Sequence, residues 1–259
     1  MTGTSDAPVF LSRFPKTRPP LSPPLAAIYR EHYQQNRAGG SPASAVSRAL
    51  ESWLHRQVAR DVVRDRTSKR TLELGAGTLN QLDFEPEVGD YDIVEPFAEL
   101  YAESPHLPRI RRIYTDVAQV PRDVRYDRIT SVATLEHICD LPVVVATAAL
   151  HLEPNGIFRA AIPSEGTILW ALGWRLTTGL EFRLKHGLDY GELLRHEHVN
   201  SSLEIAQVLQ YCFEHVEHRV FGLFKALSLY QFFACSKPAL ARCTALAATK
   251  PSATADRCR

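Results

Sequence analysis

Two glycines separated by one residue, with an acid two positions before the first, form the pattern with the clearest chemistry in this sequence. The run reads Thr71-Leu-Glu73-Leu-Gly75-Ala-Gly77-Thr-Leu-Asn80. Glycines permit a tight turn and let backbone N–H groups approach a ligand closely. The nearby acid can accept hydrogen bonds or pair with a cationic amino group. The pattern therefore predicts a ligand-binding turn between a strand and a helix, and the simpler alternative is a plain β–α corner.

A second acid stands where the next strand is expected to end. In the run Asp90-Tyr-Asp92-Ile-Val-Glu95-Pro-Phe97, Glu95 follows Gly77 by 18 residues. A carboxylate at such a strand end can accept the protons of both ribose hydroxyls. An exposed charge is the alternative, but the coincidence with the glycine turn favours a nucleotide-like ligand.

The densest group of polar side chains is His196-Glu197-His198-Val-Asn200. A histidine here could act as a general base toward a hydroxyl nucleophile. His-x-His is also a spacing found among metal ligands, but no companion acid or cysteine set is identifiable, so we expect no metal. The remaining interpretation is a polar loop before a capped helix.

Short strands alternating with helices must position these groups. From residue 69 onward, the pattern predicts strands at 70–74, 91–95, 110–114, 126–133 and 156–162. Such alternation predicts a mostly parallel sheet with helices on both faces. Residues 216–221 and 227–235 predict an antiparallel pair at the sheet edge, after a helix that the capping box Ser201-x-x-Glu204 begins.

With the glycine turn and the strand-end acid in this register, the sequence resembles the class I S-adenosylmethionine-dependent methyltransferases. Their first motif has the form E-x-G-x-G, often with a further glycine two residues on, where this sequence has Leu79. The resemblance implies an α/β, Rossmann-like fold with an antiparallel last strand. It also implies that Glu73, Gly75, Ala76 and Gly77 line the methionine end of S-adenosylmethionine.

The same resemblance assigns the rest of the cofactor site. It implies that Glu95 binds the ribose, that Phe97 lies beside the adenine, and that Asp116, after the third strand, contacts the adenine amino group. The segment ending in Glu136-His137 is similar to the end of the family's fourth strand, where open α/β sheets bind ligands. Glu136 is thus expected at the cofactor and His137 among the candidate bases.

Three regions are predicted. Residues 1–66 form an N-terminal extension and helices that cap the cofactor site, with Tyr33 helping to cover the cofactor. Residues 67–236 form the methyltransferase domain, and residues 237–259 a loose tail. Within the domain, residues 163–200 form a lid and acceptor pocket, since this long insert carries four large aromatic side chains, Trp170, Trp174, Phe182 and Tyr190.

We therefore expect methyl transfer from S-adenosylmethionine to a small polar or sugar-containing acceptor, at oxygen, with His137, His196 or His198 as base. The turn at residues 161–166 resembles that of the small-molecule branch, and the whole chain more loosely resembles uncharacterised enzymes of bacterial surface polysaccharide synthesis. The alternatives are an NAD-dependent oxidoreductase, which Asn80 and the E-x-G-x-G pattern disfavour, and a non-catalytic cofactor-binding protein. A nucleic-acid methyltransferase is disfavoured by the segment after the fourth strand, which lacks the Asn/Asp-Pro-Pro-aromatic motif.

Composition agrees with these expectations. The net charge is +1, which gives no footprint for nucleic acid. The five cysteines form no CxxC pair and are expected to be reduced thiols of a cytoplasmic protein. No signal peptide is evident, and the longest apolar stretch, at 168–174, is too short to span a bilayer. The sequence does not identify the oligomeric state.

Overall fold

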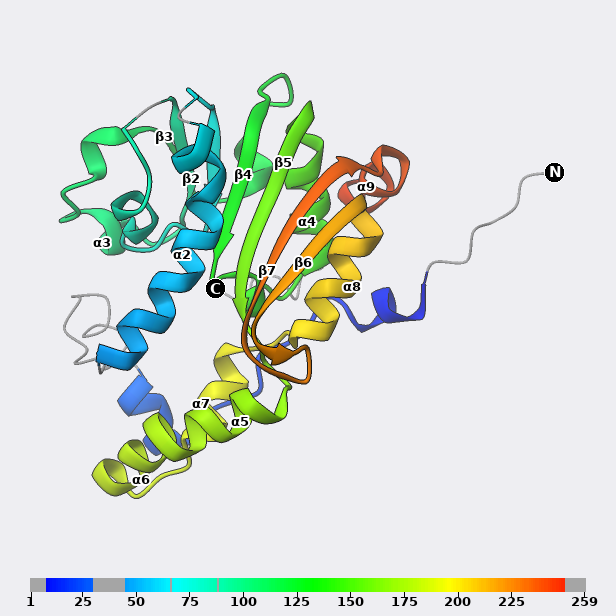
Figure 1. Cartoon of the computed structure of the whole chain (residues 1–259). Helices are drawn as coiled ribbons and strands as arrows, with labels where there is room; N and C mark the ends of the chain where they lie inside the picture. The colour runs from blue at the N-terminus through cyan, green and yellow to red at the C-terminus, as the bar shows by residue number, and fades with distance from the viewer. Residues whose placement is uncertain (1–7, 30–44, 66, 88, 250–259) are drawn as a thin grey trace.

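A seven-stranded sheet forms the centre of the protein in a computed structural model that describes residues 8–29, 45–65, 67–87 and 89–249 (Figure 1). The strand order is β3-β2-β1-β4-β5-β7-β6. The strands are β1 (Thr71–Leu74), β2 (Tyr91–Val94), β3 (Ile110–Tyr114), β4 (Tyr126–Val132), β5 (Leu152–Pro163), β6 (Phe213–Phe224) and β7 (Leu227–Pro238).

The first five strands are parallel, and β7 runs antiparallel between β5 and the edge strand β6. The predicted α/β architecture and the antiparallel pair are thus confirmed. The strand order reverses between β1 and β4, a place where the carboxyl ends of parallel strands leave a crevice for ligands. The β6–β7 pair extends beyond both predicted strands because cross-strand pairing continues past the apolar runs that marked them.

Helices cover both faces of the sheet, as predicted. The side chains of β5 alternate between the two faces, with Phe158 and Ile162 in one apolar cluster and Ala161 in the other. The helices are α2 (Ala45–Asp65), α3 (Ala98–Tyr101), α4 (Leu141–Leu150), α5 (Ile168–Trp174), α6 (Leu180–His186), α7 (Tyr190–Glu197), α8 (Ser202–Cys212) and α9 (Leu240–Ala247). Helix α2 adds Leu54 and Val58 to the Ala161 cluster, whereas α4, α8 and α9 contribute to the larger one.

Local signals explain where two of these helices begin. The capping box is present at α8, where the Ser201 hydroxyl accepts the N–H of Glu204 and the Glu204 carboxylate accepts the N–H of Ser201. The sequence also predicts that Asp140 caps α4 with Pro142 in its first turn; both residues lie at these positions, but the Asp140 side chain makes no capping hydrogen bond. Tyr33 lies outside the described residues, and so do Ser41 and Pro42, at which the sequence predicts the start of the helix that contains α2.

The two ends of the chain differ from expectation. The loose tail predicted from residue 237 instead contains α9, because Cys243 is fully buried against the core and Leu246 packs beside it. The proline-rich sequence of residues 1–24 predicts an extended or disordered start, but the structure has a short 3-10 helix there, η1 (Val9–Arg13). The sequence also predicts a short helix over residues 25–37, and residues 23–29 are helical as far as the structure describes them. The segment between these two helices makes hydrogen bonds to the rest of the protein, through Lys16 to Glu204 and through Arg18 to the carbonyl of His137.

Three cysteines, Cys212, Cys235 and Cys243, are free and buried, as predicted. Cys139 takes part in a disulfide bond, so the expectation of reduced thiols is wrong for this residue. Within the described segments, no helix has the length and apolar character needed to cross a bilayer.

Candidate functional site

The glycine turn follows β1 and is left-handed at both glycines, with φ of 67° at Gly75 and 51° at Gly77. A Cβ at Gly75 would lie 2.2 Å from Cγ2 of Thr134, so close packing as well as the backbone requires glycine there. A Cβ at Gly77 would meet no atom within 4 Å, so this side of the turn is open. Leu79, where the related motif often has glycine, keeps a left-handed φ of 67° and is fully buried, so the turn retains its shape.

Glu95, just after β2, is held against this turn. One carboxylate oxygen accepts the N–H of Gly77 at 2.9 Å, and the other accepts the N–H of Phe97 at 3.0 Å. The residue is only 4% exposed, so its charge is fixed where the ends of β1 and β2 meet. A carboxylate in this position fits the ribose hydroxyls of a nucleotide-like ligand.

Glu73 lies elsewhere, within the buried interior. Its side chain accepts a hydrogen bond from the hydroxyl of Tyr91 at 3.0 Å, and Glu73 is only 2% exposed. Burial, with a smaller contribution from Glu85, raises its pKa to about 8, while Tyr91 and Arg128 oppose the shift. The structure thus places Glu73 in a polar network with Glu85 and Arg128, and its predicted contact with the cofactor stays a prediction.

The remaining predicted cofactor residues sit at the same edge of the sheet. Ala76 is buried between the two glycines, and Phe97, half-buried, precedes α3. Asp116 is exposed and begins the short helix η4 (Val117–Gln119), where its carboxylate accepts the N–H of Ala118 at 2.8 Å. The contacts of Phe97 and Asp116 with adenine, and that of Ala76 with the methionine end of the cofactor, stay predictions.

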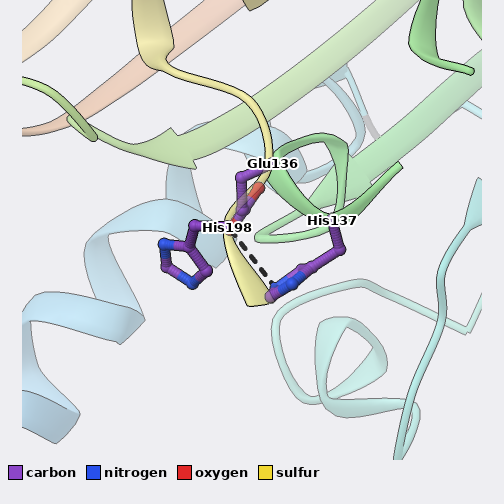
Figure 2. Close-up of side chains that lie close together, drawn as sticks. All are labelled: Glu136, His137 and His198. Atoms are coloured by element: carbon purple, nitrogen blue, oxygen red, sulfur yellow. Dashed lines mark ion pairs between the residues drawn. The ribbon is translucent and has the colours of Figure 1, made fainter. Parts of the chain in front are cut away.

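A second cluster joins Glu136, His137 and His198 (Figure 2). Glu136 and His137 belong to η5 (Leu135–His137), which follows β4, and His198 follows α7. One ligand atom from each lies within 4.8 Å of the other two, and Nε2 of His137 is 3.9 Å from Oε1 of Glu136. Thr134, just before η5, donates its hydroxyl to the carbonyl of Gly75 at 3.2 Å, so this cluster is tied directly to the glycine turn.

His196, the third predicted base, is placed differently. Its Nδ1 lies 2.7 Å from the carbonyl oxygen of Pro19, and its ring lies edge-on to Tyr29 with 5.3 Å between centroids. It does not belong to the cluster of Glu136, His137 and His198. His196 lies in the last turn of α7 and His198 just beyond its end, so the two histidines have different neighbours.

His198 is paired with Glu165, an acid that the sequence analysis did not single out as a site residue. Its Nδ1 lies 2.9 Å from Oε2 of Glu165, which also accepts the indole N–H of Trp170 at 2.6 Å. A carboxylate on Nδ1 orients an imidazole and stabilises its protonated form, which leaves Nε2 to accept a proton. Glu165 lies two residues after the end of β5, and its place in the turn after that strand was the available signal.

Glu136 is the buried carboxylate of the cluster, with 1% of its surface exposed. Burial raises its pKa to about 7, and His137 opposes the shift. Among the described residues, its Oε2 atom has no hydrogen-bond partner. Glu136 also supplies the companion acid that no sequence pattern identified, so with His137 and His198 it could hold a divalent cation.

Two residues outside the cluster hold its backbone in place. The amide of Asn200 donates to the carbonyls of Leu135 at 2.9 Å and Ile138 at 2.7 Å, on either side of the two η5 side chains. Arg18 donates from Nη2 to the carbonyl of His137 at 3.0 Å. Asn200 ended the predicted polar group, but nothing in the local sequence pointed to Arg18.

Arg18 also reaches the other segment that carries the site. Its Nη1 atom donates to the carbonyls of His196 at 2.8 Å and Glu197 at 3.0 Å. One guanidinium therefore joins the loop after β4 to the end of α7, and the planar arrangement of its N–H groups suits such a contact.

The model of a family described as a methyltransferase domain matches residues 43–231 of this chain. No sequence among the curated proteins matches it. The matched range runs from α2 into β7 and includes the glycine turn, Glu95 and the cluster of Glu136, His137 and His198.

Several solved structures resemble this one. The CurJ carbon methyltransferase has a TM-score of 0.54 at 18% identity, over 83% of this chain and 61% of that chain, so this chain spans less than two thirds of CurJ. The plantazolicin methyltransferase BpumL, with a pentazolic analogue and S-adenosylhomocysteine, has a TM-score of 0.55 at 12% identity, covering 80% and 91%. The N-methyltransferase NodS from Bradyrhizobium japonicum has a TM-score of 0.50 at 12% identity, covering 76% and 90%. At these identities the likeness shows the fold alone.

Proposed function

The chain belongs to the methyltransferase-domain family, and from this membership we propose that it methylates a hydroxyl oxygen of a small polar or sugar-containing acceptor. Use of S-adenosylmethionine as methyl donor comes with the family, and an NAD-dependent oxidoreductase is thereby set aside. The finer proposal depends on one observation: the His198–Glu165 pair lies in the cluster that is tied to the glycine turn.

The residues at the ends of β1 and β2 fit the cofactor. The open side of the turn at Gly77 gives the methionine end of the cofactor close access to backbone, and the fixed carboxylate of Glu95 suits its ribose hydroxyls. Phe97 and Asp116 would hold the adenine. When bound, S-adenosylmethionine supplies a methyl group that is already strongly electrophilic, so the chain needs mainly to align the acceptor and exclude water.

His198 is the proposed general base. In the transfer, the acceptor oxygen would replace the sulfonium sulfur at the methyl carbon, so that S-adenosylhomocysteine leaves, and the hydroxyl proton would move to Nε2 of His198. The Glu165 carboxylate on Nδ1 stabilises the resulting imidazolium. His137, whose ring centroid is 4.8 Å from that of His198, and Glu136 line the same place and would orient the acceptor.

The predicted lid, residues 163–200, supports the proposal through its attachment. Trp170 of α5 donates to the same Glu165 oxygen that faces His198, so the first helix of the insert is bonded to the proposed base pair. Trp170 also lies over His198 with 6.5 Å between ring centroids and 20° between ring planes. A flat, apolar side chain there could cover an acceptor and keep water out.

An amine acceptor is the second candidate. Three carboxylates, Glu136, Glu165 and Glu197, lie close to the two histidines, and a protonated amine would be attracted to them. Such an acceptor would need to lose a proton before attack, so the same His198 could serve it. The position of the new methyl group in the product distinguishes the two.

The test compares His198→Ala and Glu165→Gln with His196→Ala, a histidine two residues away outside the cluster. Each variant is incubated with S-adenosylmethionine labelled in its methyl group and a panel of sugars, hydroxy acids and amines. We expect His198→Ala to lower turnover about 100-fold or more and Glu165→Gln to lower it less, with His196→Ala near wild type. Cofactor affinity should change little in all three.

Normal turnover in His198→Ala would exclude this base. Methylated product carrying the label on nitrogen would replace the oxygen acceptor by the amine. Failure of the wild-type protein to bind S-adenosylmethionine or S-adenosylhomocysteine in calorimetry would contradict the proposed cofactor site itself.

A further inference from the structure

Five aliphatic side chains form an exposed file along the insert. Exposed fractions are 64% for Ile168, 49% for Leu172, 70% for Leu176, 50% for Leu180 and 80% for Leu184. They recur every fourth residue through α5, the π-helical turn η6 (Arg175–Gly179) and α6. We name this set the leucine file. Apolar side chains exposed in a continuous set mark an interaction site more often than the same residues scattered singly.

The π turn keeps the file on one side of the arm that these three elements form. In an α-helix of 3.6 residues per turn, a spacing of four overshoots a full turn by about 40° at each step. A π turn, with its i to i+5 bonds, is wider, so a spacing of four falls short of a full turn and offsets that drift. The steps through Leu176 cross this turn, so the file stays straighter than a continuous α-helix would allow.

The opposite side of the arm is already occupied. Phe182 is only 8% exposed, and its ring lies 5.4 Å from that of Tyr190, which in turn lies 6.0 Å from Trp174. The aromatic side chains of the insert therefore pack on one another and hold the arm, whereas the leucine file faces outward. The sequence predicted that the four aromatic side chains of the insert serve the acceptor pocket. Three of them, Trp174, Phe182 and Tyr190, instead pack on one another.

Charges beside the file are mostly positive. Arg175 and Arg183 precede two of its leucines, Lys185 follows the last, and all three side chains are exposed. Between residues 168 and 187 the sequence has a single acid, Glu181. A helix with an apolar line flanked by arginine and lysine is the pattern of segments that lie in the interface of an anionic bilayer.

We propose that this arm docks on an anionic lipid surface, with the leucine file inserted at the boundary of headgroups and acyl chains. Arg175, Arg183 and Lys185 would contact lipid phosphates. A second copy of the chain fits less well, because a stable dimer buries about 800 Å² on each partner and the file is one side chain wide. The positive flanks would also repel each other there. Trp170 in the first helix of the arm is bonded to Glu165. Figure 1 shows that α5 follows the end of β5, so docking would hold the acceptor end of the site at the membrane.

Docking does not depend on the proposed acceptor, and the test measures it directly. The full chain is sedimented with vesicles of phosphatidylcholine alone and of phosphatidylcholine with phosphatidylglycerol, at low and high salt. The variants are Leu176→Glu with Leu184→Glu, and Arg183→Gln with Lys185→Gln. Leu203→Glu, at a leucine 67% exposed on α8, is the matched control. Circular dichroism checks that each variant is folded.

We expect binding to the phosphatidylglycerol vesicles that falls at least tenfold in the double leucine variant, weakens with salt, and is unchanged in Leu203→Glu. The double basic variant should lose most of the preference for anionic lipid. Absence of binding at low salt, or equal binding by the double leucine variant, would overturn the proposal. A doubled mass in light scattering that the leucine substitutions abolish would do so as well, by assigning the file to a second copy.

Discussion

Gly77 donates its backbone N–H to Oε2 of Glu95 at 2.9 Å, so the turn after β1 and the acid after β2 form one unit. Replacing Glu95 by alanine removes a hydrogen-bonded carboxylate from the proposed ribose site. Charge-assisted hydrogen bonds contribute about 1.5–3 kcal/mol each. We expect the dissociation constant for S-adenosylhomocysteine, measured by calorimetry, to rise tenfold or more.

Glu103→Ala is the control for this substitution, since Glu103 is an exposed acid just beyond α3. Its affinity should match the wild type. An unchanged dissociation constant in Glu95→Ala would place the ribose elsewhere.

Arg18 is expected to act as a positioning residue. Arg18→Ala removes the bonds that join the carbonyl of His137 to those of His196 and Glu197. We expect kcat to fall roughly tenfold with little change in cofactor affinity, because the turn at Gly77 is not touched.

Arg18→Lys should restore only part of this loss, since an ammonium lacks the planar fork of donors. Arg13→Ala, an exposed arginine in η1, is the matched control. A purely structural role would appear instead as a lower Tm with a normal kcat at temperatures where the variant is folded.

Stability should depend on pH through Glu73. Its pKa is about 8 in the folded protein and 4.5 ordinarily, so between these values the folded state holds a proton that the unfolded chain releases. The free energy of unfolding therefore falls as pH rises from about 4.5 to about 8 through this group. Glu73→Gln cannot ionise and keeps an acceptor for Tyr91.

We expect Glu73→Gln to flatten the pH dependence and to raise Tm at pH 8 by several degrees, at roughly 2–4 °C per kcal/mol. Melting curves between pH 4.5 and pH 9 measure this. If Glu73 contacts the cofactor instead, the substitution will weaken S-adenosylmethionine binding without this pH signature.

Removal of divalent metal tests the alternative use of Glu136, His137 and His198. With His198 as a base, turnover should survive dialysis against EDTA unchanged, because proton transfer to imidazole needs no metal. Loss of activity that Mg²⁺, Mn²⁺ or Zn²⁺ restores would show that the three side chains act as metal ligands. His137→Ala would then lose the response to metal, and His196→Ala would keep it.

The sequence predicted those parts of the site that depend only on where each strand ends. The glycine turn, the acid after β2 and the Glu136-His137 pair each follow a strand, so parallel pairing brings them to one edge of the sheet. The pairing of His198 with Glu165 depends on how the insert after β5 folds back, which no periodicity encodes. Neither does the sequence show that Glu73 faces inward, because an acid within a strand is ordinarily expected to be solvated.

The contacts of Arg18 lie furthest from prediction, since its partners are 119 and 178 residues away. Considered alone, the proline-rich sequence of this segment predicts an extended or disordered chain. Helix α9 was missed for a similar reason, because its amphipathic pattern is short and the helix is stabilised by burying Cys243 in the core, where its thiol contacts the carbonyl of Cys212.

The long-range hydrogen bonds of the N-terminal segment also determine when during synthesis the site can assemble. Lys16 emerges from the ribosome long before its partner Glu204, which is 188 residues further on. At about 5–20 residues per second, roughly 10–40 s separate the two. During that interval β1 to β4 can pair, but the loop after β4 has no clamp. The acceptor end of the site can therefore be clamped only after residue 204 has been made, and the clamp comes from a segment that was translated well before it.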